Sequence, residues 1–227
     1  MELSSFTMQT LKNFSSINPN LVIHPGKSIM TMSEAKNILA QATVPEEFDR
    51  TFGIYDLSEF LSVLNLFETS NIQLDEHFAT VGDTSGRAKI KYFFSDTEML
   101  TSPSKPISMP EPDVTFTLDM ATLANLKRAS SALGHSEVSI TAANGVVTLT
   151  VVDSTNSTSN TYSIDVDGEY KSEDFNFIIN IANLRMIPSD YKVEISSKLI
   201  SQFTSTSEEM DLKYWVALEK SSTYNAQ

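Results

Sequence analysis

The chain has 227 residues, 41% of them hydrophobic, no cysteine, and a formal net charge of −13 at pH 7. This length suits one large domain or two ordinary ones, and the apolar content excludes a globally disordered chain. The missing cysteines exclude disulfides, zinc sites with thiolate ligands and a cysteine nucleophile. The acidic balance argues against a generic nucleic-acid binder, because most of its surface repels phosphate.

Nothing in the chain predicts insertion into a membrane or secretion. No run of 18 apolar residues occurs, and a spanning helix needs about 20. The first residues lack both the basic start and the apolar centre of a signal peptide. We therefore expect no membrane partner.

The first half of the chain reads as a helix followed by strands. A helix is predicted over Leu3–Ile17 after a brief strand, and Met8, Leu11 and Phe14 form its apolar stripe. The later patterns predict a hairpin turning at Pro25–Gly26, a strand with a loop over Met30–Thr43 in spite of its helix formers, a strand–helix–strand unit over Thr51–Leu74, and strands near Phe78–Val81 and Ala88–Phe94.

Thr101–Pro112 holds four of the eight prolines, which favour neither a helix nor a central strand. We interpret this stretch as an extended connector. The expected organisation is a first domain over residues 1–104, a proline-rich connector over 105–112 and a second domain over 113–227.

The second half follows a similar plan. Its patterns predict a strand over Val114–Leu118, a helix over Met120–Leu133 capped by Asp119, a hairpin turning at Asn144–Gly145, a strand over Thr161–Val166, and a closing strand over Tyr214–Leu218. Between the last two lies Asp174–Ile195, a strand, a short helix over Ile181–Met186 stopped by Pro188, and a strand.

Two internal matches indicate duplication. Asp174–Ile195 has the same plan as Thr51–Leu74, with Asn180 and Asp56 as equivalent helix caps. The letters TLKNFSS at Thr10–Ser16 align with NLKRASS at Asn125–Ser131. The chain is therefore expected to be a tandem duplication of an α+β domain, with a further repeat inside each domain.

Five stretches together resemble the DNA polymerase sliding clamps, or processivity factors, of T-even-like bacteriophages. They cover essentially the whole chain in order: LKNFSSIN at Leu11–Asn18, IYDLSEFLSVL at Ile54–Leu64, KPISMPEP at Lys105–Pro112, FNFIINIANLRM at Phe175–Met186 and YWVALE at Tyr214–Glu219.

The resemblance implies the DNA clamp fold. Each subunit of such a homotrimeric ring has two similar domains, with antiparallel sheets outside and two helices per domain facing a central hole. The ring encircles double-stranded DNA without sequence readout and tethers the replicative polymerase. The implied partners are the polymerase, a clamp loader and RNA polymerase late-transcription factors, in the cytoplasm of an infected bacterial host.

Basic residues on the predicted helices are the candidate DNA contacts. A clamp is expected to be acidic outside and basic on its inner helices, where phosphate contacts are independent of sequence. The candidates are Lys12, Lys127, Arg128 and Arg185. Arg128 points away from the apolar stripe at helical spacing and Lys127 lies at its margin. Without the resemblance, ordinary solvated surface charges account for all four.

Two strands with alternating charge are the candidate subunit interface. By the resemblance, the last strand of the first domain pairs with an edge strand of the neighbour's second domain. Arg87, Lys89 and Lys91 alternate on the first, and Asp165 and Asp167 on the second. Opposite charges across the seam favour this pairing over like edges. Alternatively, each alternation marks only a solvent-facing side.

The connector supplies the candidate partner-binding residues, Pro106, Ile107, Met109 and Pro110. By the resemblance it borders a pocket for peptide tails of partners, and apolar side chains on a stiff segment lose little entropy on binding. Alternatively, Ile107 and Met109 fold back onto their own domain.

No motif predicts catalysis, a cofactor or a metal site. The PGKS at Pro25–Ser28 lacks the first glycine of a phosphate-binding loop, and the three histidines share no spacing. The alternative to a clamp is a trimeric virion or scaffold protein of duplicated β-rich domains without DNA. An acidic hydrolase has no supporting constellation.

Overall fold

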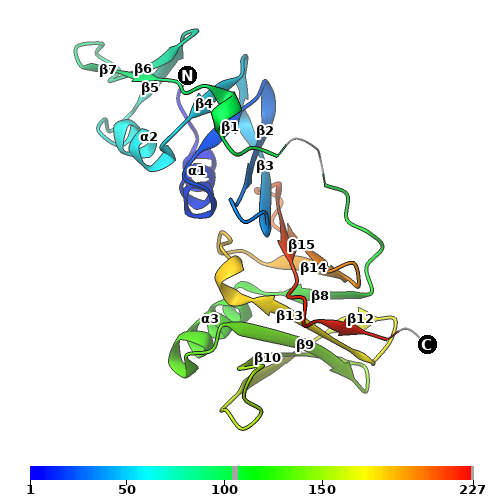
Figure 1. Ribbon diagram of the computed structural model, residues 1–227. Coiled ribbons are helices and arrows are strands. Elements are labelled where there is room, and N and C mark those ends of the chain that lie inside the picture. The colour runs from blue at the N-terminus through cyan, green and yellow to red at the C-terminus, as the bar shows by residue number, and fades with distance from the viewer. Residues whose placement is uncertain (104–106, 226–227) are drawn as a thin grey trace. The chain divides into compact units, whose positions relative to one another are not determined.

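The computed structural model describes residues 1–103 and 107–225, and the chain divides into two compact units, Met1–Lys105 and Pro106–Gln227. Unit 1 is drawn from blue to green in Figure 1 and unit 2 from green to red. Both combine antiparallel sheets with few helices. Within the described part of the chain, no helix has the length and apolar character needed to cross a bilayer.

Unit 1 begins with a helix and continues mainly in strands. Its elements are α1 (Ser5–Ile17), β1 (Leu21–Ile23), β2 (Gly26–Met32), β3 (Ile38–Phe48), β4 (Phe52–Ile54), α2 (Leu57–Leu64), β5 (Asn71–Leu74), β6 (Phe78–Gly82), β7 (Lys89–Phe93) and the 3₁₀ turn η1 (Thr97–Met99). Strand β1 pairs with β4, β2 with β3, and β5, β6 and β7 form a three-stranded sheet.

Two expectations for this unit have different outcomes. Met30–Thr43 is confirmed as strand, turn and strand, with Lys36 in the turn at φ 57°. The hairpin turning at Pro25–Gly26 was a wrong prediction, because β1 pairs with β4 while β2 pairs with β3. Local turn signals do not determine which strand completes a pair when a later strand offers the better apolar surface.

Unit 2 has more strands and one long helix. Its elements are β8 (Val114–Leu118), α3 (Met120–Leu133), β9 (Glu137–Ala143), β10 (Val146–Val152), β11 (Tyr162–Val166), β12 (Gly168–Tyr170), β13 (Phe175–Asn180), the 3₁₀ turn η2 (Ile181–Asn183), β14 (Tyr191–Ser196), β15 (Ile200–Ser205), β16 (Leu212–Ala217) and β17 (Thr223–Tyr224). One sheet runs β11-β10-β9-β13-β17, and β12, β8, β14, β15 and β16 are neighbours in that order in another. The predicted Asn144–Gly145 hairpin is confirmed as the β9–β10 turn.

The second helix expected in unit 2 is absent from its described residues. Only η2, three residues long, occupies the expected Ile181–Met186 helix. In α2 the buried positions Leu57, Phe60, Leu61 and Leu64 recur at helical spacing over two turns. After η2 the buried Leu184 and Met186 flank an exposed residue, and this spacing of two is typical of extended backbone. Pro188 also disfavours helical backbone at the residue before it.

Two buried tyrosines form hydrogen bonds with the backbone N–H and C=O groups of Ile187, directly after the segment that a helix was expected to occupy. The Tyr191 hydroxyl donates to the carbonyl oxygen of Ile187, and the Ile187 N–H donates to the Tyr214 hydroxyl oxygen over 3.1 Å. Both tyrosines are fully buried, and burial raises the pKa of each hydroxyl. The segment after η2 is therefore held by side chains from β14 and β16.

Helix α1 is anchored at its N-terminus by a carboxylate from β3. Its N-cap Ser4 accepts from the Thr7 N–H at 3.2 Å, and Glu46 accepts both the Ser4 N–H and the Thr7 hydroxyl. The helix has no acid in its first turn, so Glu46 provides the negative charge that a helix N-terminus favours. Burial raises the pKa of Glu46, but the bonds from Thr7 and Ser4 outweigh burial and hold that pKa below its ordinary value.

We predict that Glu46→Gln lowers the free energy of unfolding at pH 7 by about 1 kcal/mol, the usual cost of losing a cap. A carboxyl group with a lowered folded pKa stabilises the native state above its unfolded pKa and loses this effect as pH falls through the folded pKa. The difference between the variant and the original chain should therefore shrink below about pH 4.5. Urea unfolding from pH 7 to pH 3 measures it. The exposed neighbour Glu47 is the control, and an equal loss in Glu47→Gln would contradict the role of Glu46.

Candidate nucleic-acid interface

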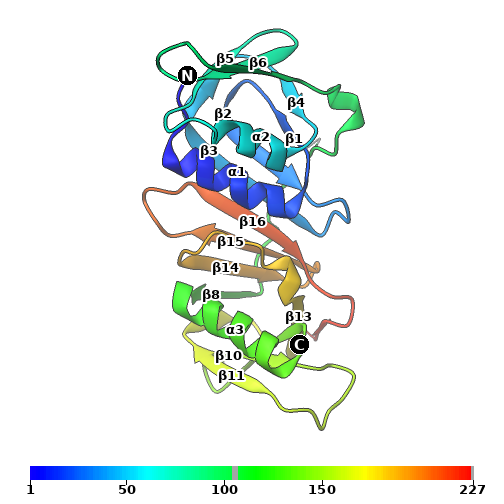
Figure 2. The ribbon, with the colours of Figure 1, turned by 90° about the vertical axis from the view of Figure 1, so that its left-hand side faces the viewer.

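Helix α1 presents one basic side chain beside a groove. Leu11, Phe14 and Ile17 are buried, which leaves Lys12 exposed on another side of the helix. Helices α1 and α2 contact each other, and Figure 2 shows them side by side. The groove between them is lined by Met8, Gln9, Lys12, Ser15, Ser58, Leu61, Ser62 and Asn65. Lys12 is the one charged residue of these eight, so the groove offers hydroxyl and amide groups around a single cation.

Helix α3 presents an arginine and a half-buried lysine. Asp119 caps it by accepting the Thr122 N–H at 2.6 Å, and Gly134 ends it in the left-handed conformation. Arg128 is exposed, and its guanidinium donates to the Asn125 side-chain oxygen one turn earlier. Lys127 is half-buried, and the loss of solvation lowers the pKa of its ammonium group. Arg128 is thus more exposed to solvent than Lys127.

Arg185 lies outside any helix, which corrects its expected position. It follows η2, is exposed, and its Nε donates to the Ala182 carbonyl oxygen over 3.1 Å. An arginine held on a turn still carries its charge toward solvent. A phosphate contact there therefore depends on the irregular segment that Tyr191 and Tyr214 hold in place.

The connector residues have different exposures. Ile107 is 37% exposed, Met109 and Pro110 are half-buried, and Pro106 lies outside the described residues. Residues 107–112 form no helix or strand. The described part of the connector therefore presents Ile107 to solvent more than Met109.

Strands β7 and β11 are both sheet edges within the described chain, since β7 pairs only with β6 and β11 only with β10. Figure 1 shows β7 at the border of its sheet. Lys89 and Lys91 are exposed on β7, and the Lys91 ammonium lies 4.3 Å from the centre of the Phe78 ring. Each edge has backbone groups available to pair with a further strand.

The remaining interface candidates lie on or next to these strands. Asp165 is exposed on β11 and accepts the Thr148 hydroxyl over 2.8 Å. Arg87 lies in the turn before β7, and Asp167 lies between β11 and β12. Of the five candidates, Lys89, Lys91 and Asp165 therefore belong to edge strands, and Arg87 and Asp167 flank them.

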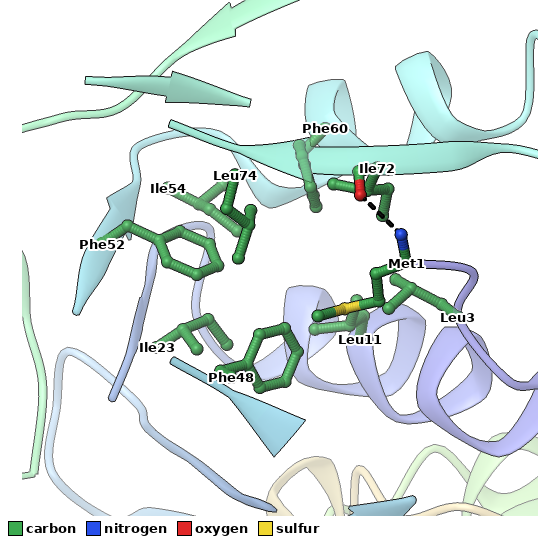
Figure 3. A pocket seen from close by; sticks show the side chains of 10 residues that line it. All are labelled: Met1, Leu3, Leu11, Ile23, Phe48, Phe52, Ile54, Phe60, Ile72 and Leu74. Carbon is green, nitrogen blue, oxygen red and sulfur yellow. Dashed lines mark hydrogen bonds between the residues drawn. The ribbon is translucent and has the colours of Figure 1, made fainter. Parts of the chain in front are cut away.

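The pocket in unit 1 is lined by apolar side chains. Figure 3 shows its lining, Met1, Leu3, Leu11, Ile23, Phe48, Phe52, Ile54, Phe60, Ile72 and Leu74. Its open space is about 10 Å³, about the minimum for one water molecule. The one hydrogen bond drawn there joins the Met1 ammonium to the Ile72 carbonyl oxygen over 2.8 Å. Among the described residues, no three His, Asp or Glu side chains gather as a metal would need.

Sequence reasoning missed the residues that hold the candidate cations. Asn125 precedes Arg128 by three positions, a spacing that places two side chains on one side of a helix, so the sequence contained this signal. The half-burial of Lys127 and the carbonyl partner of Arg185 depend on the folded backbone. No local pattern indicates either.

Comparisons with known proteins identify the family. The family models described as "gp45 sliding clamp, C terminal" and "DNA polymerase processivity factor" match residues 115–220 and 4–95. A sliding clamp of Vibrio phage KVP40 is 32% identical over 96% of this chain and 99% of its own length. A sliding clamp of Escherichia phage RB69 is 30% identical over 99% and 100%.

The fold has solved relatives as well. A proliferating cellular nuclear antigen from Thermococcus kodakaraensis aligns with a TM-score of 0.74 and 14% identity over 96% of this chain and 99% of that chain. The expected α+β clamp fold is confirmed, apart from the helix that η2 replaces. A virion or scaffold protein is not favoured by these likenesses. The chain belongs to the sliding clamp family of T4-like phages, the DNA polymerase processivity factors.

Proposed function

We propose that three copies of this chain form a ring that encircles duplex DNA and tethers the replicative polymerase of a phage inside its infected host. As a member of the sliding clamp family, the chain is a DNA polymerase processivity factor. The likeness to sliding clamps along nearly the whole chain carries the proposal. The proposal assigns no catalysis to the chain, and the ATP used in loading belongs to the clamp loader.

The placement of basic residues supports a weak, sequence-independent contact with DNA. A net charge of −13 repels phosphate in general, so attraction requires local cations facing the duplex. Lys12 and Arg128 are exposed on α1 and α3, Arg185 is exposed after η2, and Lys127 is half-buried. Few cations per subunit suit a ring that holds DNA by enclosure and must also move along it.

We predict that Arg128→Ala weakens binding to a 30-bp duplex and lowers the dependence of affinity on salt. Each lost phosphate contact should reduce the slope of log K against log [salt] by about 0.9. Fluorescence anisotropy at several salt concentrations measures the slope. The exposed Lys198, in the turn between β14 and β15, is the control. An Arg128→Ala slope equal to those of Lys198→Ala and the original chain would remove Arg128 from the DNA contact.

Ring closure is proposed to join β7 of one subunit to β11 of the next. Both strands are open edges of the described sheets and carry opposite charge. When two edge strands pair, their unpaired backbone N–H and C=O groups bond to each other. The opposite charges favour pairing of β7 with β11 over pairing of two identical edges.

We predict that Lys89→Glu with Lys91→Glu raises the dissociation constant of the trimer by about tenfold or more, because four acidic groups then face one another. Native mass spectrometry across a dilution series measures it, since the trimer has three times the 25.2 kDa subunit mass. Adding Asp165→Lys with Asp167→Lys reverses both edges and should restore the trimer. An unchanged constant in the first variant would remove the charges from the seam.

The connector is proposed to receive partners, with Ile107 and Met109 as apolar contacts flanked by Pro106 and Pro110. The resemblance that the sequence shows implies the polymerase, the clamp loader and late-transcription factors as partners. A stiff segment with an exposed apolar side chain supports peptide binding, because little conformational entropy is lost.

The proposed function itself predicts longer DNA synthesis. With the cognate polymerase, loader and ATP on primed circular single-stranded DNA, adding the protein should lengthen each polymerase run at least about tenfold. Tethering has this effect because it raises the local polymerase concentration at the primer end. Product lengths under single-hit conditions measure it, with loader and ATP but no clamp as the control. Equal lengths with and without the chain would refute a processivity role.

A further inference from the structure

A cluster of polar contacts joins the end of the connector to unit 2. The Asp113 N–H donates to the Ile195 carbonyl oxygen over 2.8 Å, and the Asp113 carbonyl oxygen accepts the Lys171 N–H over 3.0 Å. The Asp113 carboxylate accepts the Ser197 N–H over 2.7 Å. The backbone from Asp113 onward is therefore fixed on the β8–β14 side of unit 2.

The Lys171 side chain extends this attachment back into the connector. Its ammonium lies 2.7 Å from the Glu111 carboxylate and 3.7 Å from the Asp113 carboxylate. Glu111 is 82% exposed at its side chain and Asp113 only 11%. An exposed ion pair of this kind adds little to the free energy of unfolding. Any effect it has is therefore on the conformation of the connector next to it. The pair joins an exposed connector residue to the segment that follows β12.

The backbone around Lys171 is hydrogen-bonded to other parts of unit 2. It directly follows β12, and the Ser172 hydroxyl donates to the Asn225 carbonyl oxygen over 3.2 Å. The Asn225 N–H donates to the Asp174 carbonyl oxygen over 2.9 Å, just beyond β17. The main chain on both sides of Lys171 is therefore tied to neighbouring strands or to the C-terminal segment.

The connector before Glu111 has no comparable attachment. Across described residues 107–112, the Glu111 carboxylate makes the only hydrogen bond, and no backbone group makes one. Met109 lies two residues before Glu111, a span of about 7 Å in an extended chain. The position of Glu111 therefore limits the space that Met109 and Ile107 can sample.

We propose that Lys171 is a positioning residue for partner binding, which holds Glu111 and thereby presents Ile107 and Met109 in a restricted set of conformations. This inference rests on the partner site assigned above to the connector. A restricted connector pays less ordering entropy when a peptide binds, so the effect should appear as affinity.

The first measurement is the mobility of the connector in the full chain. The chain contains no cysteine, so Ser108→Cys provides a single site for a nitroxide label. Ser108 is exposed, and the label's spectrum reports local motion. Lys171→Met and Glu111→Gln should each sharpen the spectrum, whereas Lys171→Arg, which keeps the charge, should not.

A matched control breaks a similar pair elsewhere in unit 2. The Lys192 ammonium lies 2.9 Å from the Glu194 carboxylate on β14, and its side chain is 53% exposed against 45% for Lys171. Lys192→Met should leave the spectrum of the Ser108 label unchanged. Thermal unfolding should give nearly the same midpoint for all variants.

The second measurement is the polymerase concentration that half-saturates run length on primed circular DNA. Lys171→Met should raise it about three- to tenfold, the range expected when one or two further side chains must be ordered on binding. Lys171→Arg and Lys192→Met should match the original chain.

The outcomes separate the two proposals. A Ser108 spectrum that Lys171→Met leaves unchanged would overturn the anchor. A sharper spectrum with an unchanged half-saturating concentration would overturn the positioning role. If the original chain fails to lengthen polymerase runs, the proposed function fails, and with it the role of Lys171 in partner binding, while the spectra still decide whether the anchor exists.

Discussion

Packing of helices against β-sheets decides which side chains this protein can offer to a ligand. Each α-helix buries one stripe, and 49 apolar residues among those that the structure describes are buried in the two units. In α1 the buried stripe includes Leu11 and Phe14, so Lys12 remains exposed. In α3 Leu123 and Leu126 are buried, Arg128 is exposed, and the side chain of Lys127 is half-buried. The available charge is therefore a consequence of core packing.

The two units differ in how they satisfy the backbone that follows a buried strand. Unit 1 has helix α2 after β4, whereas unit 2 has the short η2 after β13. Helical backbone satisfies its own carbonyl and N–H groups, so its loss must be compensated. In unit 2 the hydroxyl groups of Tyr191 and Tyr214 do this for Ile187. Arg185 consequently lies on a segment supported by side chains from β14, the next strand, and from the more distant β16.

Sheet edges and the connector make up the rest of the proposed functional surface. An edge strand has unpaired backbone groups, and in this chain β7 and β11 present them with opposite charges nearby. The connector lacks such pairing along described residues 107–112, and the ion pair between Lys171 and Glu111 is proposed to restrain it locally while adding little to stability. The proposed partner surfaces thus lie where regular hydrogen bonding stops.

The sequence by itself determined much about this protein. Apolar spacing indicated α1, α2 and α3, Asn144–Gly145 indicated a hairpin, and motifs spread along the chain were enough for the family. These features are local, so neighbouring residues specify them. Only the tertiary structure decided that β1 pairs with β4, that η2 replaces a helix, and that Lys171 meets Glu111 sixty residues away. These outcomes depend on which segments the folded chain brings together, and a local pattern contains no information about that.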